Sequence, residues 1–142
     1  MQKRVKQRGF EVERDLVRKL WDAGFATMRA PASGAKAKRV IQPDVIAVKK
    51  GFVFCFEVKA RKRPPLYIQK DQVLKLMKWA ERAGAKPFIA IYTDRKWFFL
   101  PLGELKEYGD RYKVGREELR GAPDLRGLVS LCVHHRLTEF TH

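Results

Sequence analysis

The chain has 142 residues, of which 45% are hydrophobic and only two are cysteine. This composition excludes a disulfide-stabilised mini-protein and fits one domain with an ordinary core in a reducing, intracellular setting. Because 31 Lys and Arg residues face 16 acidic ones, a formal charge of +15, nucleic acid is the first candidate partner, with an acidic membrane surface or a merely solvated basic surface as alternatives.

No targeting or membrane segment is predicted. The basic start of the chain leads into a polar helix rather than an apolar signal segment, and the longest apolar run, 52–56, is too short to span a bilayer. We therefore expect a cytoplasmic, nucleoid-associated protein with no membrane partner.

The first predicted element is a helix over residues 6–23. Apolar side chains recur there every three or four positions, from Phe10 through Val17 to Leu20, and Leu16 and Trp21 widen this stripe. Gly24 is a typical residue to end a helix. Residues 25–30 favour a short strand.

Residues 31–39 favour a loop rich in small residues. Its cations, Lys36, Lys38 and Arg39, attract phosphate, and the segment lies between elements of one compact domain. We interpret it as a loop that contacts substrate, in preference to a linker.

A β-hairpin is predicted next, with strands at 44–48 and 52–59 and a turn at 49–51. Residues 61–66 form a basic loop, since Pro64 and Pro65 cannot continue a central strand. A helix over 70–82 follows, with Val73, Leu76, Met77 and Ala80 on its apolar face and Leu74 and Trp79 beside it. Strands at 87–92 and 97–100 come after it.

The predicted order is α-β-β-β-α-β-β, which indicates the α/β class with a mixed central sheet flanked by helices. The core of this single domain spans about residues 6–100. Beyond it, residues 101–142 are interpreted as a variable C-terminal extension in which 102–108 favour a short helix.

A cluster of possible metal ligands lies near the C-terminus, at Cys132, His134 and His135. Closed zinc sites use four ligands, and this cluster offers three, so we do not predict zinc there.

The pattern with most chemical content lies on the hairpin: Pro43-Asp44, then Glu57-Val58-Lys59. Side chains alternate across a strand, so Glu57 and Lys59 share one face, while Phe52, Phe54, Phe56 and Val58 point to the other and indicate which face is core. In an antiparallel hairpin the start of the first strand lies beside the end of the second, so Asp44 can meet Glu57.

Two convergent carboxylates are suited to a hard divalent cation, and hydrolysis of a phosphodiester uses such a cation to polarise the phosphate and activate water. Lys59 can orient the attacking water or offset charge in the transition state. We expect Mg²⁺, with Mn²⁺ able to substitute, and no small-molecule cofactor. The alternative is a solvated strand end with a structural ion pair.

Glu13 supplies a third carboxylate, because it lies in the apolar stripe of the first helix, between Phe10 and Val17. Two interpretations stand for it: a metal ligand docked over the sheet, or a residue at the edge of the stripe that pairs with Arg14 or reaches solvent.

Short motifs over roughly residues 8–100 resemble those of the archaeal-type Holliday junction resolvases, which are dimeric nucleases of the restriction-endonuclease-like fold. The motifs are specific in combination rather than singly. They are Gly9-Phe-Glu-Val-Glu-Arg-Asp-Leu16, Gly24-Phe25, Arg29, Ser33-Gly34, Pro43-Asp44, Glu57-Val-Lys59, Leu66-Tyr67, Lys70 and Gln72.

The resemblance implies roles for individual residues. Asp44 and Glu57 would ligate the metal together with the carbonyl of Val58, and Lys59 would be the catalytic lysine. The helix carboxylate of the family maps to Glu13, with Glu11 as the competing register.

The resemblance also implies that Ser33 lies near the scissile phosphate as a further catalytic residue, while Tyr67, Lys70 and Gln72 line the site and its approach. With the cations of the helix start and the loops, the residues expected to contact DNA are Arg8, Arg29, Ser33, Lys36, Lys38, Arg39, Arg61, Lys62, Tyr67, Lys70 and Gln72.

The leading hypothesis is a homodimeric, structure-selective endonuclease that resolves four-way DNA junctions by paired metal-dependent nicks. The helix at 70–82 and the strand near Trp97 are the two candidates for the dimer face. Alternatives are a restriction or repair endonuclease of the same fold and a non-catalytic, basic nucleic-acid-binding module.

Overall fold

In the computed structural model, the backbone is described for residues 2–31 and 40–140, and the side chains for residues 9–31 and 40–132. The elements are, in chain order, α1 Gln2–Asp22, β1 Ala26–Arg29, β2 Val45–Lys49, β3 Phe52–Ala60, β4 Leu66–Gln69, α2 Lys70–Ala83, β5 Lys86–Thr93, β6 Lys96–Pro101, the short 3-10 helix η2 Leu102–Glu104, β7 Lys106–Tyr108, β8 Arg111–Val114, α3 Arg116–Gly121 and α4 Leu125–Phe140.

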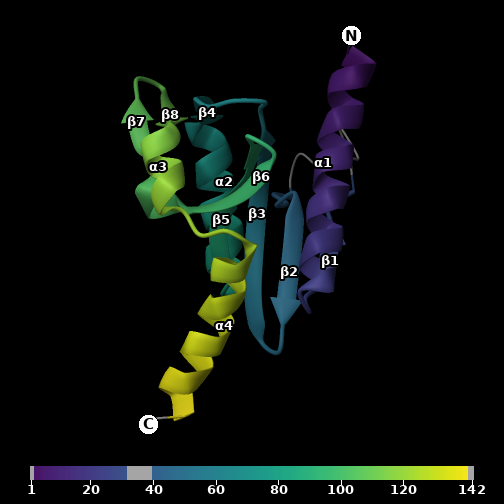
Figure 1. The fold of residues 1–142 in the computed structure, drawn as a ribbon, viewed down its shortest axis with the longest axis vertical. Coiled ribbons are helices and arrows are strands. Elements are labelled where there is room, and N and C mark those ends of the chain that lie inside the picture. Colours follow the sequence, from purple (N-terminus) through teal and green to yellow (C-terminus); the bar gives the residue numbers. More distant parts are fainter. Residues whose placement is uncertain (1, 32–39, 141–142) are drawn as a thin grey trace.

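The main sheet has five strands in the order β1-β2-β3-β5-β6. Strands β3 and β5 run parallel, and the other three neighbouring pairs are antiparallel. Helices flank this mixed sheet (Figure 1), so the predicted fold class is confirmed. The predicted first helix, hairpin, second helix and last two strands all form close to their expected bounds.

A second sheet of three strands, in the order β4-β8-β7, differs from the sequence prediction. Residues 66–69, which begin at the last residue of the expected basic loop and were assigned no strand, form β4, and residues 106–108, expected to be helical, form β7. The signal was weak because these strands have only three or four residues and gain their hydrogen bonds from partners distant in sequence.

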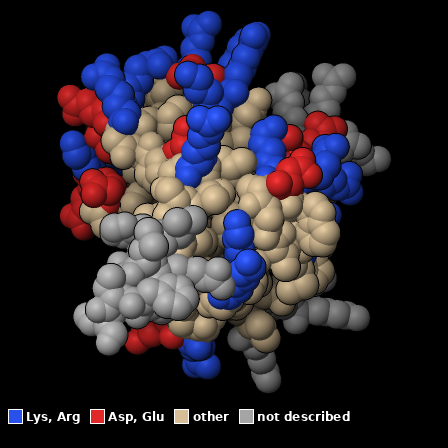
Figure 2. All heavy atoms as spheres, turned by 60° about the horizontal axis from the view of Figure 1, so that its bottom comes forward, with Lys and Arg blue, Asp and Glu red and all other residues tan. Residues whose placement is uncertain are grey.

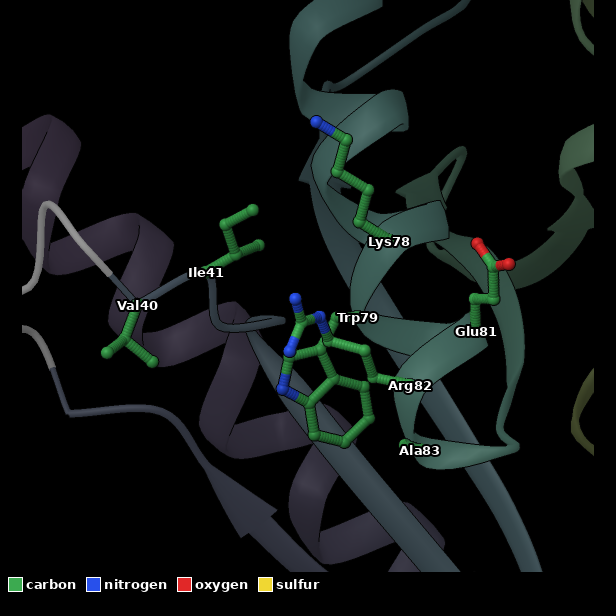
Figure 3. Close-up of a pocket in the computed structure, with 7 residues that line it drawn as sticks. All are labelled: Val40, Ile41, Lys78, Trp79, Glu81, Arg82 and Ala83. Carbon is green, nitrogen blue, oxygen red and sulfur yellow. The ribbon is translucent and has the colours of Figure 1, made fainter.

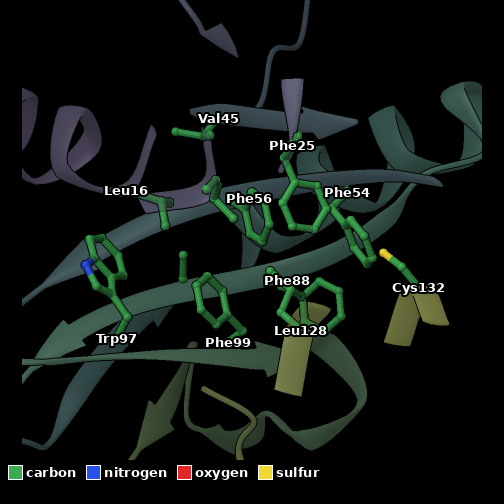
Figure 4. Packing of buried hydrophobic residues seen from close by; sticks show 13 residues of the cluster. Leu16, Phe25, Val45, Phe54, Phe56, Phe88, Trp97, Phe99, Leu128 and Cys132 are labelled. Carbon is green, nitrogen blue, oxygen red and sulfur yellow. The ribbon is translucent and has the colours of Figure 1, made fainter. Parts of the chain in front are cut away.

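Both faces of the main sheet are covered, which corrects the prediction of a single core face on β3. Phe54 and Phe56 pack on the side that faces α1, whereas Cys55 is fully buried on the opposite side, among residues of α2 and the second sheet. Figure 4 shows phenylalanine rings of the first cluster lying between Leu16 and the α4 residues Leu128 and Cys132.

Helix α1 is held against the far edge of the sheet by a polar contact in addition to its apolar stripe. The indole N–H of Trp97 on β6 donates a hydrogen bond of 2.9 Å to Asp15 Oδ2. Leu16 and Leu20 of the predicted stripe are completely buried, whereas Trp21, which was expected to widen that stripe, is exposed.

Helix α2 covers the other face with Val73, Leu76 and Ala80 and ends at Gly84, whose left-handed φ of 66° is easily adopted without a side chain. Leu74 and Met77 were expected on or beside the buried face of this helix, but both are exposed, Leu74 to 56%. Among the described residues, no helix has the length and apolar character needed to cross a membrane.

The packed rings of Phe54, Phe56, Phe88 and Phe99 should make a large contribution to the free energy of unfolding. Phe56 is fully buried and lies 5.6 Å from the ring of Phe99 and 6.2 Å from that of Phe88. We expect Phe56→Ala to lower the free energy of unfolding by about 4 kcal/mol, measured by denaturant titration, because it leaves a cavity that the rigid sheet cannot close. The exposed control Trp21→Ala, at a side chain outside both candidate dimer faces, should change it by less than about 0.5 kcal/mol. Equal losses in the two variants would contradict this account of the core.

Candidate active site

Asp44 precedes β2 and is fixed to β3 by two backbone contacts. Its N–H donates to the carbonyl of Phe56 at 2.9 Å, and its Oδ2 accepts a hydrogen bond of 2.8 Å from the N–H of Val58. The hairpin register, in which Val45 is opposite Phe56, therefore extends to Asp44 and Glu57. The two carboxyl groups lie on the same side of the sheet, as the hairpin geometry predicted.

The Asp44 and Glu57 carboxyl groups behave as one coupled pair. Burial raises the pKa of Glu57 to about 8, and the charge of Asp44 adds to this rise against the opposing effect of Lys59. Burial likewise raises the pKa of Asp44, although the hydrogen bond from Val58 and one shared with Glu57 lower it. The pair therefore holds a proton at neutral pH unless a cation replaces it.

Lys59 lies beside this pair on the same face of β3. Its Nζ is 3.7 Å from Glu57 Oε1, and both side chains are largely buried. The structure thus brings together Asp44, Glu57 and Lys59, the three residues that the sequence pattern singled out.

Glu13 approaches the pair from α1. Burial raises its pKa to about 7, the charge of Asp44 contributes to the rise, and Arg29 opposes it. Arg29 Nη1 lies 3.9 Å from Glu13 Oε1. Since Glu11 is exposed, Glu13 is the helix carboxylate that faces the site.

Arg29 itself is held in place for contact with an anion. Its guanidinium lies 5.0 Å from the centre of the Phe10 ring, and its Nη1 is buried with no hydrogen-bond partner. A buried donor without an acceptor is costly, so this atom is suited to bind a group that the isolated chain does not contain.

The donor chemistry fits a hard divalent cation. Asp44 and Glu57 offer adjacent carboxylate oxygens whose mutual repulsion a cation would relieve, and Glu13 adds a third negative charge that interacts electrostatically with both. However, within residues 9–31 and 40–132 no three His, Cys, Asp or Glu side chains are grouped tightly enough to enclose an ion. The pair is therefore the part of the predicted ligand set that the geometry supports most directly.

A cavity of about 360 Å³ opens beside Glu57, between α2 and the segment that leads to Asp44. Gln72, one of the predicted contact residues, lines this cavity, and its side-chain Oε1 is buried without a partner. Lys75 lines it as well and was missed from the sequence, although its position one helical turn after Gln72 placed it on the same face of the helix.

A second hollow lies further along α2. In Figure 3, Trp79 and Arg82 point from the helix towards the segment that carries Val40 and Ile41. Val40 and Ile41 line both hollows. Together the two hollows form a groove between α2 and the segment that leads to Asp44.

The other predicted contact residues that the structure describes interact with groups other than the carboxylates of Glu13, Asp44 and Glu57. Arg61 donates to the carbonyl of Pro65 at 2.7 Å, Lys62 is exposed, and Lys70 pairs with Glu107 at 3.5 Å. Tyr67 lies on β4 beneath the guanidinium of Arg111. The predictions for the side chain of Arg8 and for residues Ser33, Lys36, Lys38 and Arg39 fall outside the described residues, as do those for His134 and His135.

Positive charge is unevenly distributed over the surface. Figure 2 shows Lys and Arg side chains gathered along the upper part of the face drawn there, with fewer carboxylates between them. This arrangement is typical of a surface that binds a polyanion.

Known proteins resemble this chain over most of its length. A family model described as archaeal Holliday junction resolvase matches residues 4–137. A protein of Sulfurisphaera tokodaii named crossover junction endodeoxyribonuclease Hjc is 37% identical over 126 residues, 87% of each chain, and one of Archaeoglobus fulgidus with the same name is 36% identical over 111 residues, 78% of this chain and 80% of the relative.

The fold agrees with this assignment. The solved structure of Archaeoglobus fulgidus Hjc, described as a Holliday junction resolvase, superimposes with a TM-score of 0.79 at 30% identity, covering 87% of this chain and 96% of that one. The resemblance inferred from the short motifs is confirmed: this chain belongs to the archaeal Holliday junction resolvase family.

Proposed function

We propose that this chain is a structure-selective DNA endonuclease that resolves four-way junctions by paired, metal-dependent nicks. The observation that carries the proposal is the partly buried pair of Asp44 and Glu57 with Lys59 beside it, in a member of a family whose relatives are named crossover junction endodeoxyribonucleases. The substrate of an enzyme with this charge is a polyanion, and the location that suits it is the nucleoid.

Asp44 and Glu57 would hold Mg²⁺, or Mn²⁺ in its place, with the carbonyl of Val58 as a further ligand and Glu13 in the outer part of the site. When bound, such an ion polarises the phosphate and lowers the pKa of water. The raised pKa values of Glu13 and Glu57 support this assignment, because burial and the neighbouring charge of Asp44 both disfavour the ionised carboxylates, and a bound cation would compensate that charge.

Two cations of the chain have separate roles in the proposed reaction. Lys59 is close enough to the carboxylates to orient the attacking water and to offset charge that develops on the phosphate. Arg29, whose buried Nη1 has no hydrogen-bond partner and lies 3.9 Å from Glu13 Oε1, would bind a phosphate oxygen next to the reacting one. Ser33 is proposed to act near the same phosphate.

The active assembly is proposed to be a homodimer with two-fold symmetry, so that its two sites nick strands of like polarity in a two-fold symmetric junction. Of the two candidate faces, α2 is favoured. Leu74 and Met77 are exposed on it, whereas Trp97 of β6 is only 7% exposed and is engaged with Asp15.

The first test removes each carboxylate while keeping its shape. We expect Asp44→Asn and Glu57→Gln to lower junction cleavage by on the order of a thousandfold, because the cation loses a ligand, while binding persists or tightens as a negative charge near phosphate is lost. Asp22→Asn is the control, since Asp22 is exposed at the end of α1.

Rates are measured under single-turnover conditions, and binding by fluorescence anisotropy without divalent cation. Wild-type cleavage rates in both variants would exclude this site and leave the non-catalytic binding module as the better interpretation.

The second test concerns the substrate. With Mg²⁺ present, we expect synthetic four-way junctions to be nicked in symmetrically placed strands, while linear duplexes of the same sequences stay intact. Equal cleavage of both would remove junction selectivity, and cleavage confined to one sequence or lesion would favour a restriction or repair endonuclease.

The third test uses the link between protonation and stability. The pKa of Glu57 is higher in the folded protein, at about 8, than its unfolded value of 4.5. The contribution of Glu57 to the stability of the metal-free protein is therefore complete below about pH 4.5 and is lost as pH rises through about 8. We expect Glu57→Gln to remove this loss and to stabilise the metal-free protein at high pH by on the order of 2 kcal/mol.

Denaturant titrations in EDTA across this pH range measure the effect. Mg²⁺ should stabilise the wild type at high pH and have less effect on the variant. An unchanged pH profile in Glu57→Gln would contradict the coupled carboxyl pair.

A further inference from the structure

The second sheet presents an outward face on which only Tyr67 has so far been assigned a role. Strand alternation buries Leu66, Ile68 and Val114 against the core, so their neighbours point outward. By the register of the three strands, this outer face consists of Tyr67, Gln69, Lys106, Tyr108, Arg111 and Lys113. All three strands lie within the described residues, and the six positions include three cations and no carboxylate.

The tyrosines and cations of the outer face are in contact with one another. Arg111 lies over the ring of Tyr67 at 4.7 Å from its centre, and Lys113 lies over the ring of Tyr108 at 5.2 Å. The two rings are themselves 5.5 Å apart. Each cation is thus held on an aromatic support, which lowers the entropy that it must lose on binding an anion.

The charges of Arg111 and Lys113 remain available to a partner. Within the part of the chain that the structure describes, Lys113 forms no ion pair, and Arg111 has only Asp110 at 3.8 Å, a fully solvated side chain whose attraction is weak. Lys106 differs from them, because Glu117 and Glu118 of α3 already offset its charge at 3.8 and 3.2 Å.

The outer face lies at the end of the molecule that carries the candidate active site. In Figure 1, β4, β7 and β8 stand at the end where β2 begins and β3 finishes, which is where Asp44 and Glu57 are located. Chain continuity agrees, because β4 leads directly into α2, whose first turn contains Gln72 beside Glu57.

We propose that the outer face binds the sugar-phosphate backbone of one duplex arm of the DNA substrate, with Arg111 and Lys113 as the phosphate ligands. This inference rests on the proposed function and extends it to residues outside the β2–β3 hairpin. Backbone contact is favoured over base stacking because the faces of Tyr67 and Tyr108 are already covered by the two cations, whose N–H groups are free to point outward.

The test compares two double variants that remove the same charge from opposite ends of the molecule. Arg111→Gln/Lys113→Gln alters the outer face. Lys50→Asn/Lys86→Gln is the matched control, since both lysines are exposed at the far end of the β2–β3 hairpin and Asn tolerates the left-handed φ of 48° at position 50.

Affinity is measured by fluorescence anisotropy over a series of salt concentrations, without divalent cation, for a four-way junction and for a linear duplex. We expect the outer-face variant to bind the junction roughly tenfold more weakly than wild type and to lower the slope of log affinity against log salt by about 2, one for each lost phosphate contact. The control should stay within about twofold of wild type.

Equal weakening of both double variants would overturn the proposal, because only overall charge would then matter, and so would an unchanged slope in the outer-face variant. Thermal melts exclude unfolding as the cause of a loss, and Arg111→Lys/Lys113→Arg, which keeps both charges, should restore the slope. Wild-type cleavage is assayed in parallel with Mg²⁺. If the wild type fails to cut junctions, the proposed function fails, while the comparison on linear duplex still decides whether the outer face binds DNA.

Discussion

The candidate active site depends on a single side chain that completes a β-ladder. Asp44 stands one residue before β2, yet its backbone N–H bonds to Phe56 and its carboxylate accepts the N–H of Val58, so both its main chain and its side chain are tied to β3. This attachment places its remaining oxygen beside Glu57 and Lys59. Without it, Asp44 would lie on a free strand end, and neither its contribution to the raised pKa of Glu57 nor a shared cation would follow.

The meeting of Asp44, Glu57 and Lys59 could be predicted from sequence because the geometry of a β-hairpin is local. The period of two along β3 puts Glu57 and Lys59 on one face whatever else the chain does. The turn is one residue shorter than predicted, because Lys49 pairs with Phe52 across Lys50 and Gly51, and this register places Asp44 opposite Glu57. The same reasoning erred about the faces of the sheet. Cys55 on the face of Glu57 is fully buried, and only the docking of α2 and the second sheet, which are long-range events, explains this.

The second sheet shows what sequence patterns omit. Strands β4, β7 and β8 have three or four residues each, alternate too briefly to stand out, and exist because β8 supplies hydrogen bonds to β4 across more than forty residues of chain. The contact role of Tyr67 was implied only by resemblance to a family, and its cationic partner Arg111 lies in a region where that resemblance offered no guide. Pairing between distant segments thus determined the part of the surface that could not be predicted.

The pairing of β4 with β8 also orders events during synthesis. A ribosome releases the hairpin, α2 and the main sheet well before residues 111–114 emerge, so the carboxylate pair can form while β4 still has an open edge. Only the last quarter of the chain closes that edge and fixes the strand that leads into α2. The last quarter of the chain therefore completes the sheet beside the carboxylate pair after the residues of the pair itself have been synthesised.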